Sequence, residues 1–187
     1  MLSSLLKGTF FLLLLIVLKY IEMKTNFRIN CSALFLLIAF SASAQYVVKS
    51  SDLNQMGALK LAEQAKLEAQ KLDKNVSVAV LNSSGVTLLL VKGDNVGPHN
   101  TEASRRKAYT SVSTKTPSFE LMEKAAADPT ATNLNTLPEL LLLGGGVPIF
   151  KDGELVGSLG VSGGGGGEND HNIAKKAVES LGFTIKK

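Results

Sequence analysis

Two histidines, His99 and His171, are the side chains of this chain best suited to bind a metal ion. Each stands beside a turn, which is where binding residues are usually placed. His99 follows Gly97-Pro98, and proline stiffens that turn just before a predicted helix. His171 falls in the first turn of the last predicted helix, where the helix dipole favours a neutral imidazole. Because neutral imidazole is the commonest metal ligand in proteins, both residues are candidate ligands, although each could also be plain surface.

A run of three cations, Arg105, Arg106 and Lys107, follows the turn that carries His99 and Asn100. Guanidinium binds a carboxylate through two parallel hydrogen bonds, and lysine supplies a point charge. Consecutive helical residues diverge by about 100°, so one or two of these cations can serve one ligand. The alternative is a solvated helix face. Asn100 joins these residues in the candidate site.

Five consecutive glycines, Gly163 to Gly167, lie between a predicted strand and the last helix. Backbone amides that point from such a loop form an anion nest, and Gly163 and Gly164 are its candidate binding residues. No Lys-Ser/Thr pair follows the loop, so a nucleotide-binding P-loop is not indicated. Ser162 superficially resembles the nucleophile of a Gly-x-Ser-x-Gly elbow, but that motif needs helical residues next, and glycines are poor helix formers. We therefore expect no catalytic nucleophile.

The elements that must position these residues are visible in the hydrophobic periodicity. We predict a helix over 53–72, preceded by Ser51, and a helix over 117–128. We also predict a helix over 101–112 capped by Thr101, and one over about 169–182 capped by Asn169 or Asp170. We predict strands over 76–81, 86–92, 140–143, 147–150 and 155–161. Asp152-Gly153 suits a type I′ turn between the last two strands. Hairpin-linked strands predict an α+β fold, a single domain with an antiparallel sheet of about five strands flanked by helices.

Two sequence blocks carry a family resemblance. The first is GGVPI, a short turn, GSLGVSG and the glycine loop, followed by Asp and an Ala-rich helix. The second is DNVGPHNTEASRRKAYTS at 94–111, in which an Asp-containing loop leads into a helix reading A-x-x-K-A-x-T. These blocks resemble the GlcG/HbpS-like haem-binding family, which includes the C-terminal domain of PduO-type proteins. The resemblance spans roughly residues 52–182 and implies the same α+β layer arrangement and self-association.

The resemblance implies a protein that binds haem to scavenge, store or sense it. Haem iron usually takes an imidazole as axial ligand, which favours His99 because its loop matches the family block. Arg105, Arg106 and Lys107 would then pair with the propionates. Some family members place a histidine near the first helix, whereas residues 45–74 contain none here. The alternative is an enzyme or accessory protein acting on a small organic acid, because the family includes members linked to glycolate and diol metabolism. A purely structural oligomer is the third possibility.

The first 44 residues read as a signal peptide. Lys24 and Arg28 precede an apolar run at 33–40, and Ala42-Ser43-Ala44 fits the cleavage rule for small residues. We expect Met23 as the true start, cleavage after Ala44, a mature domain over 45–187, and a periplasmic or extracellular location. An N-terminal membrane anchor is the alternative, but the apolar run at 9–18 is short for a bilayer span.

Composition limits the partners of the mature chain. Removal of residues 1–44 leaves 16 basic against 15 acidic residues and no cysteine, so the mature domain forms no disulfide. The surface is then almost neutral and the chain has no Trp, which argues against nucleic acid, since its binding needs clustered cations. We expect a small-molecule ligand and a homo-oligomer, with no stable membrane anchor after cleavage.

Overall fold

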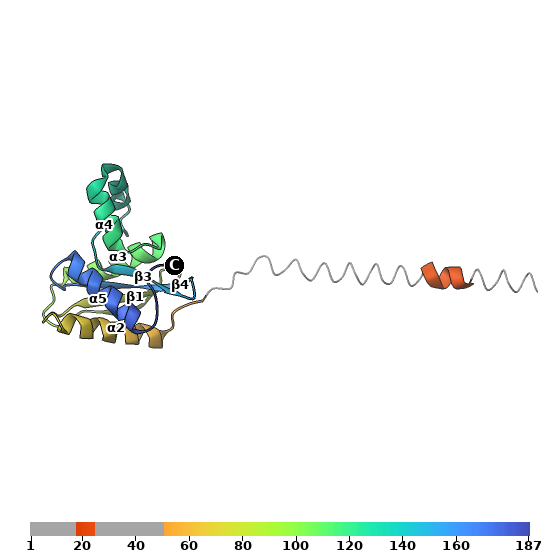
Figure 1. Cartoon of the computed structure of the whole chain (residues 1–187), viewed down its shortest axis with the longest axis horizontal. Coiled ribbons are helices and arrows are strands. Elements are labelled where there is room, and N and C mark those ends of the chain that lie inside the picture. The colour runs from red at the N-terminus through yellow and green to blue at the C-terminus, as the bar shows by residue number, and fades with distance from the viewer. Residues whose placement is uncertain (1–17, 25–50) are drawn as a thin grey trace, which may run out of the picture. The chain divides into compact units, whose positions relative to one another are not determined.

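The computed structural model describes residues 18–24 and 51–187. The chain divides into two units, 1–49 and 50–187, and the described part of the first unit, residues 18–24, is a short helix (Figure 1). The predicted cleavage site after Ala44 lies outside the described residues and stays a prediction. Within the described ranges, no helix has both the length and the apolar character to cross a membrane.

The second unit is built on one antiparallel sheet. Its strands are β1 (Ser77–Asn82), β2 (Thr87–Val91), β3 (Gly146–Lys151) and β4 (Glu154–Ser162), in the order β2-β1-β4-β3. Asp152 and Gly153 have φ angles of 51° and 79°, so the β3–β4 connection has the positive φ values of the predicted type I′ turn. At the other hairpin, the Asn82 side chain accepts hydrogen bonds from the backbone amides of Ser84 and Val86. Turn chemistry thus fixes both hairpins.

Helices cover both faces of the sheet. α2 (Gln55–Gln70) and α5 (Gly167–Ser180) form the main core with one face, on which Val78 and Val80 of β1 point. α3 (His99–Thr114) packs on the opposite face, against Ala79 and Leu81. Alternation of β1 side chains between two buried faces therefore makes a three-layer domain (Figure 1). The predicted α+β fold is confirmed.

Two glycines let α3 lie unusually close to the sheet. A Cβ on Gly146 would overlap the carbonyl oxygen of Lys107, and one on Gly160 would overlap that of Ser104. Both overlaps involve helix backbone, which cannot move aside as a flexible side chain can. The residues α3 presents here are small as well, with Ser104, Ala108 and Ser111 fully buried. Small residues on both sides thus set the height of α3 above the sheet.

α4 (Ser118–Ala127) and the 3₁₀ helix η2 (Pro129–Thr136) stand out from the layers (Figure 1). α4 begins after Pro117 and ends before Asp128, as predicted. The polar loop predicted next is instead η2, because the Asp128 side chain caps it by accepting from the Thr130 amide at 2.9 Å. Only Ser118 of these two helices is buried. The pair forms an arm at the edge of the domain.

Some predicted elements were wrong. Leu140–Leu143 is no strand, so the described sheet has four strands. Side chains of α3 and α4 bind its backbone in place of a neighbouring strand: Leu141 N–H donates to Thr110 Oγ1 at 2.8 Å, and Ser118 Oγ donates to the Leu143 carbonyl at 2.6 Å.

Two predicted caps were also wrong. α3 starts at His99 after Pro98 without a side-chain cap, so Thr101 lies inside the helix. α5 starts at Gly167, so neither Asn169 nor Asp170 is its cap.

Gly160→Ala should destabilise the domain by about 3 kcal/mol or more, because the added Cβ meets helix backbone and α3 must move off the sheet. Urea unfolding followed by circular dichroism measures this. Gly57→Ala is the matched control, since its Cβ meets only the flexible end of Leu53 and alanine favours the helix, so its change should stay within about 1 kcal/mol. Equal midpoints for the two variants would contradict the close approach of α3.

Candidate functional site

A buried ion pair, Lys107–Asp170, lies where α3, β4 and α5 converge. Lys107 Nζ lies 2.8 Å from Asp170 Oδ2, and the two side chains are 4% and 5% exposed. The same ammonium donates to the Val161 carbonyl at 3.2 Å and to Ser162 Oγ at 3.3 Å. All three donor positions of the ammonium therefore have acceptors, as a buried charge requires.

Ser162 and Asn100 extend this ion pair into a hydrogen-bond network. Ser162 Oγ donates to Asn100 Oδ1 at 2.8 Å, and Asn100 Nδ2 donates to the Gly97 carbonyl at 3.2 Å. The network thus connects the end of β4 to the turn that carries His99. Because the Ser162 hydroxyl is committed to Asn100 and Lys107 is paired with a carboxylate, the two do not form a nucleophile–base pair.

The glycine loop is closed by the other oxygen of the same carboxylate. Gly164 N–H donates to Asp170 Oδ1 at 2.6 Å. Gly163, Gly165 and Gly166 have φ angles of 111°, 95° and 139°, a region that L-residues with side chains rarely adopt. The predicted anion-binding loop therefore already holds an anion, and that anion is the chain's own Asp170.

These contacts change the roles expected for Lys107 and Gly164. Lys107 was predicted to pair with a ligand carboxylate, but burial and the ion pair give it a structural role. The sequence analysis missed Asp170 as its partner. The sequence did contain a sign that Lys107 is buried. Ser104, Lys107, Ala108 and Ser111 follow the three- and four-residue spacing of a buried helix face.

The two arginines point to different protein partners, as their spacing predicted. Arg105 donates to both carboxylate oxygens of Glu102, at 3.0 and 2.6 Å, and to Glu139 at 2.8 Å. The hydrogen bond with Glu102 raises the pKa of Arg105 and lowers the pKa of that carboxyl. Arg106 donates to the Leu140 carbonyl at 2.6 Å, while its Nε is buried and lacks a partner within the described residues. A ligand carboxylate at Arg105 would have to displace one of two glutamates.

His99 is the more accessible histidine. It is the first residue of α3 and is exposed, and its ring lies over the turn, since a Cβ on Gly97 would come within 2.9 Å of His99 Cε1. No hydrogen bond of its ring occurs among residues 18–24 and 51–187. The ring is thus free to bind a ligand. The next residue, Asn100, is held in place by its hydrogen bonds to Ser162 and the Gly97 carbonyl.

His171 lies at the base of the α4 arm. Its ring stacks on Phe119 with centroids 5.1 Å apart and an interplanar angle of 23°. Its Nδ1 is buried without a partner in the described part of the chain. Burial and, second, the nearby Lys175 lower the pKa of His171, against the opposite effect of Glu120 and Glu123. The imidazole is therefore neutral at pH 7, but one face is covered by Phe119.

The structure brings only some of the predicted site residues together. Asn100, Lys107 and Gly164 meet in the buried network, whereas each arginine has its own partners, His99 stands exposed at the start of α3 and His171 contacts α4. Across the described residues, no group of three or more His, Cys, Asp or Glu side chains is arranged to hold a metal ion. A single axial imidazole, which needs no such group, is compatible with this arrangement.

Comparison with known proteins identifies sequences and structures that this chain resembles. A family model described as "Haem degrading protein HbpS-like" matches residues 53–179. Protein GlcG of Escherichia coli K12 is 34% identical over 112 residues, which are 59% of this chain and 81% of GlcG.

Two solved structures have the same fold. A double mutant of Streptomyces reticuli HbpS has a TM-score of 0.66 and 34% identity, covering 73% of this chain and 91% of that one. A PduOC:heme complex also has a TM-score of 0.66, with 26% identity over 73% of this chain and 99% of that one.

His171 should make stability depend on pH. Because its pKa is lowered in the folded state, its contribution is present above the unfolded value of about 6.5 and is lost as pH falls through the lower folded value. His171→Phe keeps an aromatic ring against Phe119 and removes the titration. The wild type should therefore lose more stability than His171→Phe between about pH 7.5 and pH 5, measured by urea unfolding. Parallel losses in both proteins would show that His171 titrates normally.

Proposed function

The chain belongs to the HbpS-like family of haem degrading proteins, and from this membership we propose that it is a secreted haem-binding protein. One observation carries the proposal: a PduOC chain matched over 99% of its length has been solved with heme bound. Haem scavenging, storage and sensing are all compatible with such a protein. We propose haem binding as the shared activity, and scavenging, storage or sensing as its use.

The residues of this chain fit haem in the type of donor they offer. Bound haem would supply an iron that accepts an axial nitrogen, and His99 offers an exposed imidazole without a hydrogen-bond partner in the described residues. His171 offers a neutral imidazole, but Phe119 covers one face of its ring. We therefore propose His99 as the axial ligand and His171 as the alternative. Arg106, which has a buried Nε without a described partner, is the cation we propose for a propionate.

The same proposal includes export and self-association. The basic and apolar segments before Ala44 support export of a chain that begins at Gln45. β2 supports self-association, because it is an outer strand of the sheet whose Leu90 and Val91 are 41% and 44% exposed. An unpaired edge strand with exposed apolar side chains is a surface on which a second copy can pair.

One purification tests these points together. The full chain is expressed in a bacterial host, the exported fraction is recovered, and its N-terminus is sequenced. Light scattering gives its mass, and hemin titration follows the Soret band. We expect Gln45 as the first residue, a mass above that of the monomer, and a sharpened Soret band that saturates. A chain beginning at Met1 would refute export, and a titration that never saturates would refute specific haem binding.

His99→Ala should weaken haem affinity at least about tenfold and shift the Soret maximum, because the axial nitrogen is lost. Stability should change by less than about 0.5 kcal/mol, since the side chain is exposed and makes no described hydrogen bond. His171→Phe is the matched control and should leave the spectrum unchanged. If the two variants exchange these results, His171 is the ligand, and if neither changes the spectrum, the imidazole assignment is wrong.

A further inference from the structure

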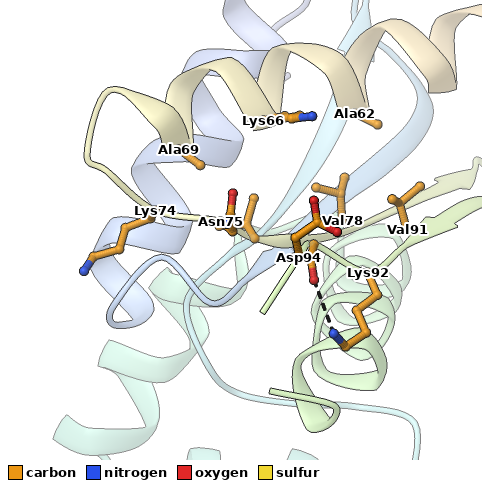
Figure 2. Close-up of a pocket in the computed structure, with 11 residues that line it drawn as sticks. Ala62, Lys66, Ala69, Lys74, Asn75, Val78, Val91, Lys92 and Asp94 are labelled. Atoms are coloured by element: carbon orange, nitrogen blue, oxygen red, sulfur yellow. Dashed lines mark hydrogen bonds between the residues drawn. The ribbon is translucent and has the colours of Figure 1, made fainter. Parts of the chain in front are cut away.

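A small cavity lies between α2 and the sheet (Figure 2). Its volume is about 240 Å³. Pockets that enclose drug-sized ligands measure roughly 300–1,000 Å³, so this cavity suits a shorter molecule and excludes a macrocycle such as haem. Its existence is therefore not explained by the proposed haem function.

The walls of the cavity are apolar on both sides. Ala62 and Ala69 of α2 form one wall, and Val78 and Val91 of the two neighbouring strands form the other. Alanines on the helix leave the space that larger side chains would fill. A ligand with a short hydrocarbon body would remove apolar surface from water here, at about 25 cal/mol per Å².

Two unpaired charged groups stand at the rim. Asp94 rises from the loop after β2 with its carboxylate turned toward α2, and Lys66 lies on α2 (Figure 2). Neither side chain makes a hydrogen bond or ion pair with any residue that the structure describes. Lys74 and Lys92 also line the cavity, the latter with its ammonium 3.3 Å from the Gly93 carbonyl. Figure 2 shows both of these ammonium groups turned away from Lys66 and Asp94, so these two side chains carry the charges that a ligand would meet at the rim.

The loop that carries Asp94 is held in place. A Cβ on Gly93 would lie 2.5 Å from the Val76 carbonyl and 2.9 Å from Val96, so glycine allows the loop to pack directly on the backbone just before β1. Val96 in turn lies beneath Gly163, where a Cβ would come within 3.0 Å of it. The Asp94 backbone is thus positioned before any ligand arrives, which lowers the entropy that binding costs.

We propose that this cavity binds a small carboxylate that carries a hydrogen-bond donor and a short apolar body. The ligand carboxylate pairs with Lys66, its hydroxyl or similar donor bonds to Asp94, and its carbon chain lies against the alanine and valine walls. Lys66 favours an anion, because its ammonium lies at the rim without a partner among the described residues. The proposal stands independently of haem binding.

Thermal unfolding of the full chain, without hemin, tests the proposal with three probes of matched size. 3-Hydroxybutyrate carries the carboxylate, the donor and the apolar body, butyrate lacks the donor, and 1,3-butanediol lacks the carboxylate. A ligand that binds only the folded state raises the unfolding midpoint, and at a fixed concentration the rise is larger for a ligand of higher affinity. We expect the largest rise with 3-hydroxybutyrate, a smaller one with butyrate and none with 1,3-butanediol. Sodium sulfate at the same ionic strength controls for a salt effect.

Three variants test whether the rise in the unfolding midpoint comes from a ligand bound in this cavity. Lys66→Met keeps the hydrocarbon stem but removes the charge, and should weaken 3-hydroxybutyrate at least about tenfold. Asp94→Ala should abolish the preference for 3-hydroxybutyrate over butyrate. Ala62→Leu should fill the cavity and prevent binding of both acids while keeping the charges. Lys60→Met is the matched control on α2, since Lys60 pairs with the exposed Glu63 and does not line the cavity.

The possible results of these measurements either support the carboxylate site or overturn it. Loss of the midpoint rise in Lys66→Met and Ala62→Leu, with Lys60→Met unchanged, supports the site. Equal rises with all three probes or with sulfate would overturn it, as would a Lys66→Met protein that responds like the wild type. No rise with any probe would also overturn it. Haem binding by the same preparations is measured separately, so its failure leaves these results unaffected.

Discussion

The buried ion pair between Lys107 and Asp170 is the interaction on which the rest of this structure depends. Removing two charges from water costs several kcal/mol each, and their attraction offsets this only when every remaining hydrogen-bonding position is satisfied. Here Val161, Ser162 and Gly164 supply those partners. The ion pair therefore fixes α3, the end of β4, the glycine loop and α5 relative to one another. Through Ser162 it also holds Asn100, which leaves the neighbouring His99 exposed on a positioned turn.

Local sequence was enough to predict most of the fold. Both hairpins follow from turn residues that bond to their own backbone or accept positive φ angles, as at Asn82 and Asp152-Gly153. The helices follow from apolar periodicity, since the buried residues of α2 recur at three- and four-residue steps. Proline set the start and aspartate the end of α4. These features need no information from distant parts of the chain.

The parts of the fold and the site that the sequence did not predict depend on residues far away in the chain. Leu140 to Leu143 looks like a strand by composition, but Thr110 and Ser118 bind its backbone from helices that pack beside it. Asp170 looks like a helix cap, but its partner lies 63 residues away on α3. Arg105 looks free to bind an anion, whereas Glu139 reaches it from 34 residues away. For Asp170 and Arg105 the residue type correctly indicated polar chemistry, and in all three cases only the fold decided which partner was taken.

Native-state hydrogen exchange at the Gly164 amide tests this account most directly. Amides in a surface loop of five glycines ordinarily exchange through small local openings. If the ion pair closes the loop, the Gly164 amide should exchange as slowly as the amides of β4, because its release requires the buried carboxylate to move. Exchange at the rate of the exposed Gly165 and Gly166 amides would contradict the claim that Asp170 holds the glycine loop and, with it, the candidate site.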